Sequence, residues 1–466
     1  MSMHLSHEEE DRNLSLSRFE SMLKTNKVLF FDSEEFEDII LHYMDIGKPS
    51  LAKKALKLAL EQHPKSTGLK LVQVEMLIFE DKLETAEKLL NELYAIEPTN
   101  EEIYIQKANI FSKKDNHEKA VELLKIALKY TDDYADVHNL IGMEYLFMDE
   151  LELAKEYFIK CLEEEPEEQS SLYNVIYCFE FLEQYEEAIQ FLTNYIDNNP
   201  YSEIAWHQLG RLNYTIKNYE DAYTAFDYAT VIDDQFMGAF MEKAKSLERL
   251  KRYKEAIDNY NETIRLEDPT SYALLRIGKC YEKLGNDLEA LKFFNQTVHE
   301  DPLLDKGWIA ITDHHFKHND FQKALYFVNK AIAIDGENRF YWKRFAAINK
   351  ALNLFEEAEY GYRKAVEFGD TELETWLYWT NILQYLGEFD AAIQTLLQAC
   401  DHFPDEYEIE YRLAGLHLTL NETEKGLYHL NNGLRLSFKN KFLLEEIFPS
   451  IWNTTLVQET IAKYKK

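Results

Sequence analysis

The chain has 466 residues, of which 46% are hydrophobic, and it contains only 15 glycines and 9 prolines. This composition supplies a large core and disfavours strand-rich or loop-rich folds, so we expect nearly all helix. With 84 acidic against 51 basic residues the net charge is −33, which opposes binding to nucleic acid or anionic membranes. The four cysteines have neither disulfide nor zinc-site spacing, which is typical of a reducing compartment.

Residues 1–32 are predicted to form an N-terminal tail and a capping helix. Met1 to Arg12 is polar and acidic and lacks the apolar segment that a signal peptide needs. No stretch approaches the ~20 apolar residues of a membrane span. Leu14 to Lys27 is predicted to be helical. We therefore expect a cytoplasmic protein that does not bind membranes.

From residue 33 to residue 440 the sequence repeats every 34 residues. One small residue, which we call the alanine column, recurs at this interval without insertion or deletion: Ala52, Ala86, Ala120, Ala154, Ala188, Ala222, Ala256, Ala290, Ala324, Ala358, Ala392 and Gly426. A bulky residue such as Trp308 often precedes it by sixteen positions, and a second small residue such as Gly142 by twelve. Proline often follows the column by twelve positions, where it ends a helix. Small residues let two helices approach closely, and large side chains fill the space beside them.

This pattern predicts twelve helix–turn–helix repeats. Their bounds are 33–66, 67–100, 101–134, 135–168, 169–202, 203–236, 237–270, 271–304, 305–338, 339–372, 373–406 and 407–440. The first three repeats and the last depart most from the pattern, as where Ile40 and Val74 take the small position. Residues 441–466, interrupted at Pro449, are predicted to form one or two C-terminal capping helices.

The bulky, small, alanine and proline columns resemble the tetratricopeptide repeat family. The resemblance implies an all-α fold, a right-handed α–α superhelix (solenoid) of twelve helix pairs with terminal capping helices. It also implies that the first helix of each pair lines an inner, concave surface. No segment outside the array is large enough to be a catalytic domain, so we expect a protein that is not an enzyme.

A second stripe of residues runs along the first helices, next to the packed face. Its members stand 18, 15, 11, 8 and 7 residues before the alanine column, which places them on one side of each helix. We call this the inner stripe. In repeats four and five it is mostly apolar and aromatic, and its candidate partner-binding residues are Asn139, Met143, Phe147, Tyr173, Tyr177 and Phe181. Exposed aromatic patches are typical of protein-binding surfaces, but packing of Leu146 and Phe147 on the next repeat explains these two equally well.

In repeats six to ten the inner stripe becomes basic. The candidate partner-binding residues there are Arg211, Lys245, Arg249, Lys279, Lys283, Lys306, Lys317, Lys343 and Lys350, against the acidic Glu248, Glu282 and Asp313. This sorting predicts a positive inner surface for an acidic segment or a C-terminal carboxylate. Pairing of these cations with acids of neighbouring repeats is the alternative. Some family members clamp chaperone C-termini with a Lys, Asn and Arg set, but here Ala347 stands where the asparagine is expected.

No Gly-rich phosphate loop, nucleophile elbow or HExxH motif is present, and we expect no cofactor. His314 and His318 lie one helical turn apart, a spacing that a metal could use. His315 falls in a column that holds tyrosine elsewhere, which favours a core role, and we assign no metal site.

These features favour a scaffold that binds a protein or peptide partner, acidic in character, and that binds no nucleic acid. Two other hypotheses stay open. The chain could be a regulatory or targeting repeat subunit of an enzyme complex, or a structural protein that self-associates into a homo-oligomer through its end repeats.

Overall fold

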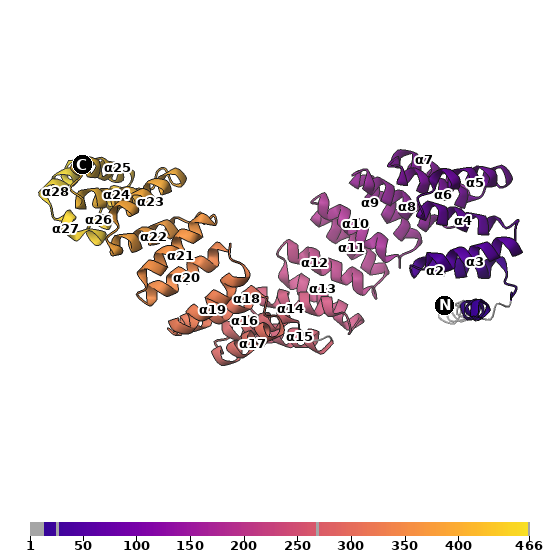
Figure 1. Ribbon diagram of the computed structural model, residues 1–466, viewed down its shortest axis with the longest axis horizontal. Coiled ribbons are helices and arrows are strands. Elements are labelled where there is room, and N and C mark those ends of the chain that lie inside the picture. Colours follow the sequence, from indigo (N-terminus) through magenta and orange to yellow (C-terminus); the bar gives the residue numbers. More distant parts are fainter. Residues whose placement is uncertain (1–13, 25–27, 267–269, 465–466) are drawn as a thin grey trace. The chain divides into compact units, whose positions relative to one another are not determined.

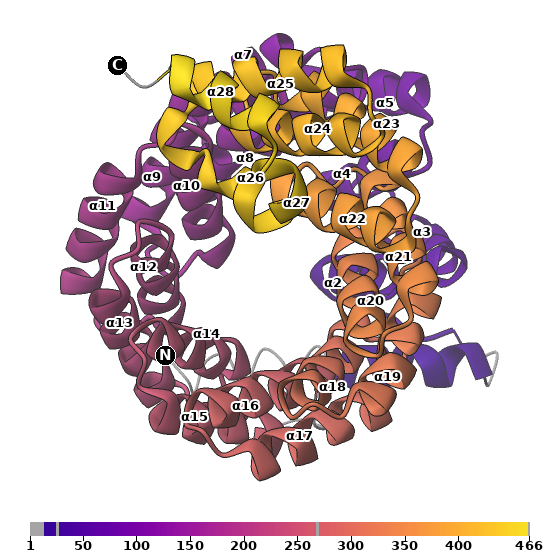
Figure 2. The same ribbon diagram turned by 90° about the vertical axis from the view of Figure 1, so that its left-hand side faces the viewer.

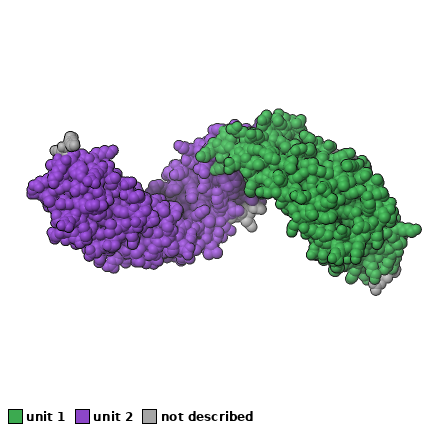
Figure 3. All heavy atoms as spheres, turned by 90° about the horizontal axis from the view of Figure 1, so that it is seen from above, with its two compact units in different colours: residues 1–218 green, residues 219–466 purple. Residues whose placement is uncertain are grey.

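The computed structural model describes residues 14–24, 28–266 and 270–464. The expected tail, Met1 to Arg12, and the expected end of the first helix at Lys27 lie outside the described residues. The described part of the chain is helical and contains no strand, and it divides into two compact units, Met1–Asn218 and Tyr219–Lys466 (Figure 3). The all-α fold of paired helices predicted from the sequence is therefore confirmed within each unit.

The helices follow one another with short connections, and neighbouring helices in the chain pack against each other within each unit (Figure 1). Unit 1 contains α2 (Ser33–Asp45), α3 (Pro49–Gln62), α4 (Thr67–Phe79), α5 (Leu83–Ile96), α6 (Glu101–Lys113), α7 (His117–Ala127), α8 (Tyr134–Phe147), α9 (Leu151–Glu164), α10 (Gln169–Phe181), α11 (Tyr185–Asn198) and α12 (Glu203–Thr215).

Unit 2 continues the same alternation and ends in short helices. It contains α13 (Tyr219–Ile232), α14 (Met237–Arg249), α15 (Tyr253–Leu266), α16 (Ser271–Lys283), α17 (Asp287–Glu300), α18 (Asp305–Lys317), α19 (Phe321–Ile334), α20 (Arg339–Ala351), α21 (Phe355–Glu367), α22 (Leu373–Leu386), α23 (Phe389–His402), α24 (Tyr407–Thr419), α25 (Thr423–Leu436), η1 (Phe438–Asn440), α26 (Phe442–Ile447), α27 (Pro449–Trp452) and α28 (Thr455–Lys463).

The alanine column forms the centre of the packing. All eleven of its alanines are fully buried, and Gly426 is buried as well. The second small column faces a large ring of the paired helix. A Cβ on Gly142 would lie 2.7 Å from the ring of Phe158, and one on Gly278 would lie 2.5 Å from that of Phe294. Glycine is therefore required sterically at these two positions.

The turn inside each repeat uses a left-handed residue that the sequence columns do not reveal. Residues with positive φ occur every 34 positions, five before the alanine column: Gly47, Asp81, Asp115, Asp149, Glu183, Lys217, Lys251, Gly285, Asn319, Asn353, Gly387 and Asn421. At Asp149 the amide donates to the carbonyl of Leu146 at 3.0 Å, and that of Glu150 donates to Tyr145 at 3.0 Å. This is the Schellman arrangement that ends a helix. Only three of the twelve residues are glycine, so the shared feature is a backbone angle.

In several repeats the residue of the bulky column is hydrogen-bonded to the loop that ends the preceding repeat. Trp308 Nε1 donates to the carbonyl of Pro302 at 2.9 Å, Trp342 Nε1 to that of Gly336 at 2.8 Å, and Tyr104 Oη to that of Pro98 at 2.8 Å. Each bond joins the first helix of a repeat to the preceding loop. These two columns therefore fix the step from one repeat to the next.

Helices at both ends of the chain cover apolar surface. Residues 14–24 are helical, Phe19 is fully buried, and Arg18 pairs with Glu35 of α2 at 2.6 Å. At the other end α26 and α27 contact α24, and α28 contacts α25 (Figure 2). We expected one or two helices here, and the structure has three short α-helices. The helical segment is interrupted at Pro449, which begins α27, and again at Thr454, whose extended backbone precedes α28.

Candidate partner-binding surface

The aromatic residues of the inner stripe in unit 1 are exposed to solvent. Tyr173 is 43% exposed, Tyr177 42% and Phe181 63%, whereas Val175 and Cys178 on the same helix, α10, are buried. The rings of Tyr177 and Phe181 contact each other at 4.4 Å between centroids. Packing on neighbouring repeats therefore does not account for these three side chains.

Residues of α8, α10 and α12 enclose a hollow of about 390 Å³ beside these rings. Its lining consists of Leu146, Tyr173, Asn174, Ile176, Tyr177, Glu180, Gln208 and Arg211. Four of these residues carry apolar or aromatic surface, and the hollow lies wholly within unit 1. It is the place where the structure brings sequence-predicted site residues together.

The other predicted residues of unit 1 have distinct surroundings. Asn139 accepts a hydrogen bond from the Ser171 hydroxyl at 3.1 Å, and Met143 Sδ lies 3.6 Å from Asn174 Nδ2, so both are half-buried links between repeats. Phe147 is 58% exposed and its ring lies 5.3 Å from that of His117. Leu146 is half-buried and packs on the core, while it also lines the hollow. Both sequence interpretations therefore describe part of this region.

A second hollow lies on the inner stripe of the first three repeats, where the sequence analysis named no site. It encloses about 310 Å³ and is lined by Met44, Glu75, Ile78, Phe79, Gln106, Asn109, Ser112 and Lys113. Phe79 is 64% exposed and stands in the same column as Phe147 and Phe181. That column is the signal from which this second hollow could have been predicted.

Carboxylates follow one another along the inner stripe of unit 1. Burial raises the pKa of Glu75, and the nearby negative charge of Glu102 raises it further. Burial also raises the pKa of Glu102, and the charge of Asp136 adds to that increase. Burial, then Asp133 and Glu168, raises the pKa of Asp136. None of Glu75, Glu102 and Asp136 forms an ion pair with any described residue. The inner stripe of unit 1 therefore combines aromatic rings with uncompensated negative charge.

Several of the predicted basic residues are neutralised. Arg211 lies 3.2 Å from Glu180 in unit 1, and in unit 2 Lys245 lies 2.7 Å from Glu242. Lys317 pairs with Asp287 at 3.0 Å. Lys343 pairs with Asp370 at 3.1 Å and with Glu372 at 2.6 Å. Four of the nine residues are thus paired with acids, but only Arg211 and Lys317 pair with acids of a neighbouring repeat, as the alternative to a positive surface supposes.

Three other lysines of unit 2 keep their charge uncompensated. Lys279, Lys283 and Lys306 form no ion pair with any residue that the structure describes. Burial lowers the pKa of Lys279, and the charges of Arg276 and Lys306 lower it further. We call Lys279, Lys283 and Lys306 the lysine cluster.

Two arginines that the sequence analysis overlooked explain why this positive charge persists. Arg276 binds Glu248 at 2.5 Å, and Arg344 binds Asp313 at 2.7 Å. Both stand fourteen positions before the alanine column, outside the stripe as we defined it. The two arginines therefore pair with Glu248 and Asp313, two of the three acidic residues on the inner stripe near the lysines.

The remaining two predicted residues lie at helix ends. Lys350 is exposed near the end of α20, with Nζ 5.2 Å from the ring centre of Tyr378. Arg249 is the exposed last residue of α14.

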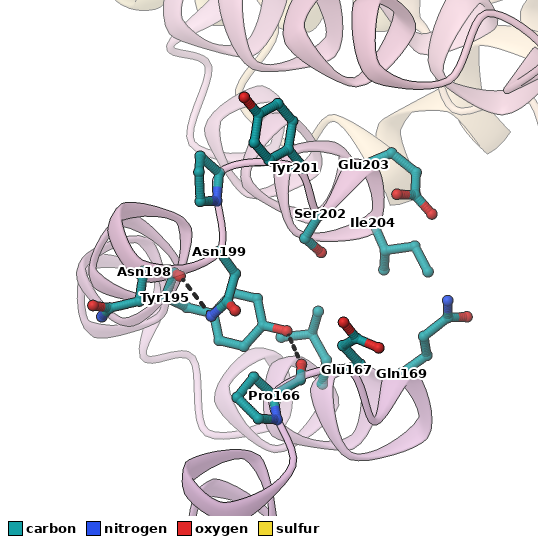
Figure 4. Close-up of a pocket in the computed structure, with 12 residues that line it drawn as sticks. Pro166, Glu167, Gln169, Tyr195, Asn198, Asn199, Tyr201, Ser202, Glu203 and Ile204 are labelled. Atoms are coloured by element: carbon teal, nitrogen blue, oxygen red, sulfur yellow. Dashed lines mark hydrogen bonds between the residues drawn. The ribbon is translucent and has the colours of Figure 1, made fainter. Parts of the chain in front are cut away.

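A further hollow of about 480 Å³ lies at the loops between repeats in unit 1 (Figure 4). Tyr195 donates its hydroxyl proton to the carbonyl of Pro166, and Asn199 Nδ2 donates to the carbonyl of Tyr195 at 3.1 Å. The other residues that line this hollow include Glu167, Glu203 and the exposed Tyr201, and none of them was a predicted site residue. Two prolines that separate the repeats, Pro166 and Pro200, shape this hollow.

The histidine group of unit 2 consists of His314, His315 and His318, and it has His315 against the core as expected. His315 stacks on Phe327 with 5.5 Å between ring centres, as its core column predicts. His314 is the more buried residue, with 8% of its surface exposed. Burial lowers the pKa of His314, and the neighbouring His318 and His315 lower it further. His314 is therefore a neutral imidazole near pH 7.

Within the described residues, no helix combines the length and the apolar character that crossing a bilayer requires.

Comparisons with known proteins agree with the repeat pattern. Tetratricopeptide-repeat family models match residues 77–143, 135–168 and 241–304. No curated protein matches the chain.

Solved structures with a similar fold include the C-terminal part of a repeat-containing protein from Cytophaga hutchinsonii, with 14% identity over 52% of this chain and 99% of that one, at a TM-score of 0.43. A tetratricopeptide repeat protein from Parabacteroides merdae shows 15% identity over 54% and 99% of the two chains, at 0.40. The Cut9–Hcn1 hetero-tetramer of APC/C shows 15% over 99% and 95%, at 0.31. At these identities and scores, nothing about function is inferred from the three structures.

The family-model matches and the buried 34-residue alanine column lead to the same conclusion. Tetratricopeptide repeats are therefore present in this chain.

Proposed function

We propose that the chain is a protein-interaction scaffold whose inner stripe binds an extended or helical segment of a partner. The hollow beside Tyr173 and Tyr177 carries this proposal, because aromatic rings there stay exposed around a cavity of about 390 Å³. Covering apolar surface contributes ~25 cal/mol per Å², so an apolar side chain in this hollow is an effective anchor. Repeat proteins bind partners on extended surfaces of this kind.

Unit 2 supports an acidic partner segment. The lysine cluster has no ion pair with a described residue, and the burial of Lys279 strengthens its attraction for a carboxylate. Apolar anchors would therefore bind in unit 1, and carboxylates would bind the lysine cluster in unit 2. This arrangement requires neither a cofactor nor catalysis by the chain.

The anchor contact is tested with a phage-displayed library of random peptides selected on the full-length chain. We expect enriched peptides to contain Leu, Phe or Trp. Substitution Tyr177→Ala should weaken a selected peptide about tenfold, because it removes one wall of the hollow. Tyr428→Ala is the matched control. Tyr428 is 63% exposed and lies on α25, the second helix of its repeat, which is outside the inner stripe. Equal binding by wild type and Tyr177→Ala would contradict the anchor proposal.

The charge contact is tested with the triple variant Lys279→Glu, Lys283→Glu, Lys306→Glu. Selected peptides rich in Asp and Glu should lose at least tenfold in affinity, and their wild-type binding should weaken as salt is raised. The control is Lys254→Glu, Lys292→Glu, Lys330→Glu, which makes the same change in net charge on exposed residues of α15, α17 and α19. If both triple variants weaken binding equally, net charge alone is responsible and the lysine cluster is not a site.

A further inference from the structure

Two histidines and one aspartate converge at the junction between repeats eight and nine. Asp287 is the first residue of α17, His314 lies in the last turn of α18, and His318 is the C-cap residue of α18. One potential ligand atom from each residue lies within 4.8 Å of the other two. All three belong to unit 2. Asp287 stands 27 positions before His314, so the packing of consecutive repeats creates the group.

We propose that Asp287, His314 and His318 form a binding site for a divalent transition metal ion, with Zn²⁺ as the physiological candidate. Two imidazole nitrogens and one carboxylate oxygen are a donor set that zinc accepts, and a water molecule completes the tetrahedron. The site revises the assignment of no metal from the sequence, which recognised the histidine spacing and missed the aspartate.

The distances suit such an ion. His318 Nε2 lies 3.2 Å from Asp287 Oδ2, and two ligands of a tetrahedral zinc ion with bonds of ~2.0–2.1 Å stand roughly 3.3 Å apart. The ring centres of His314 and His318 are 4.6 Å apart. The side chain of His318 is 44% exposed and can therefore rotate to bring its ligand atom closer to that of His314 when an ion binds.

The surroundings prepare the ligands. His314 is buried, which holds its ring in place beside that of His318. Lys317 Nζ holds the other oxygen of Asp287, Oδ1, at 3.0 Å. That bond directs Oδ2 toward His318, as partners of metal ligands commonly do. A bound ion would join α17 of repeat eight to the end of α18 in repeat nine.

The test is a titration of the metal-free, full-length chain with Co²⁺, followed by visible absorption, and with Zn²⁺, followed by calorimetry. We expect one tight ion per chain with the d–d absorption of a four- or five-coordinate cobalt ion. His318→Ala and Asp287→Asn should each lower the affinity at least tenfold. His299→Ala, which removes an exposed histidine of α17, should retain the wild-type affinity.

Folding of the variants is checked by thermal unfolding without metal. Zn²⁺ should raise the Tm of the wild type and of His299→Ala, and should leave that of His318→Ala unchanged. The proposal is overturned if wild type shows no cobalt absorption, or if His318→Ala and Asp287→Asn bind both ions as tightly as wild type. Loss of binding only in His299→Ala would also overturn it.

Discussion

The two units share one packing scheme and differ in the charge of their inner stripes. In unit 1 the half-buried Glu75 and Glu102 face other acids, and no described residue pairs with them. In unit 2 the half-buried Lys279 lies near the cations Arg276 and Lys306 as well as near the acids Glu248 and Glu282. In both cases a charged group is kept partly desolvated beside like charge, which costs stability. A buried column of small residues that recurs in every repeat leaves the inner stripe free to vary.

The comparison also shows how the positive charge of unit 2 arises. The cations that stand fourteen positions before the alanine column, Arg276 and Arg344, occupy the nearby acids. In unit 1 that position holds Asp38 in the first repeat and uncharged residues in the following repeats, such as Gln106, Asn174 and Gln208. The local sign of the inner stripe therefore depends on a neighbouring column as well as on the stripe itself.

The largest expected effect tests whether the packing is indeed equivalent in the two units. Gly142→Ala in unit 1 and Gly278→Ala in unit 2 each place a Cβ less than 3.0 Å from a phenylalanine ring. Each substitution should lower the free energy of unfolding of its unit by about 1–3 kcal/mol. Hydrogen exchange resolved by peptide would measure the loss in each unit. A large effect in one unit and none in the other would contradict the shared scheme.

Much of this scheme could be predicted from the sequence, because it depends on the size of residues at a fixed period. The alanine column predicted the buried centre of the repeats, and His315 was correctly placed against the core. The left-handed turn was missed because it depends on a φ angle that Asp, Glu, Lys, Asn and Gly all adopt here. Arg276 and Asp287 were missed for another reason. Each lies beside a partner in a neighbouring repeat, and a pattern of residues along one helix does not reveal contacts between repeats.

The next effect concerns pH and should separate the units. Glu75, Glu102 and Asp136 have raised pKa values, so these three carboxylates bind more protons in the folded chain than in the unfolded chain. Their contribution to stability is present below their ordinary pKa and is lost as pH rises through the raised values. In unit 2 a hydrogen bond from Lys317 lowers the pKa of Asp287, so its contribution is lost only as pH falls through that lowered value.

Lowering the pH from 7 to about 4.5 should therefore stabilise the surroundings of Glu75, Glu102 and Asp136 relative to those of Asp287, because these carboxylates respond in opposite directions. Hydrogen exchange of α4, α6 and α8, corrected for the intrinsic pH dependence, would be compared with that of α17, which begins at Asp287. Equal changes in the two units would show that the inner-stripe acids of unit 1 are fully solvated.

A single carboxylate offers a smaller and more specific test. Glu75→Gln removes a charge that faces Glu102 and should raise the free energy of unfolding by about 0.5–1 kcal/mol. Glu80→Gln is the control on the same repeat, because Lys53 and Lys82 both bind Glu80 and lower its pKa. Urea unfolding should show Glu75→Gln more stable, and Glu80→Gln less stable, than wild type. The reverse order would remove the contrast in charge between the units.

The smallest effect should be the same in both units, because it belongs to the turn and not to the inner stripe. Glu183 in unit 1 and Lys251 in unit 2 have φ values of 56° and 61°, a region that favours glycine. Glu183→Gly and Lys251→Gly should each stabilise the chain by about 0.3 kcal/mol, since relief of the left-handed strain exceeds the added entropy of the unfolded chain. Asn319→Gly should give no gain, because asparagine tolerates this conformation. Matched urea unfolding curves would decide this, and a gain in only one unit would mean that the turns, like the inner stripes, differ between the two.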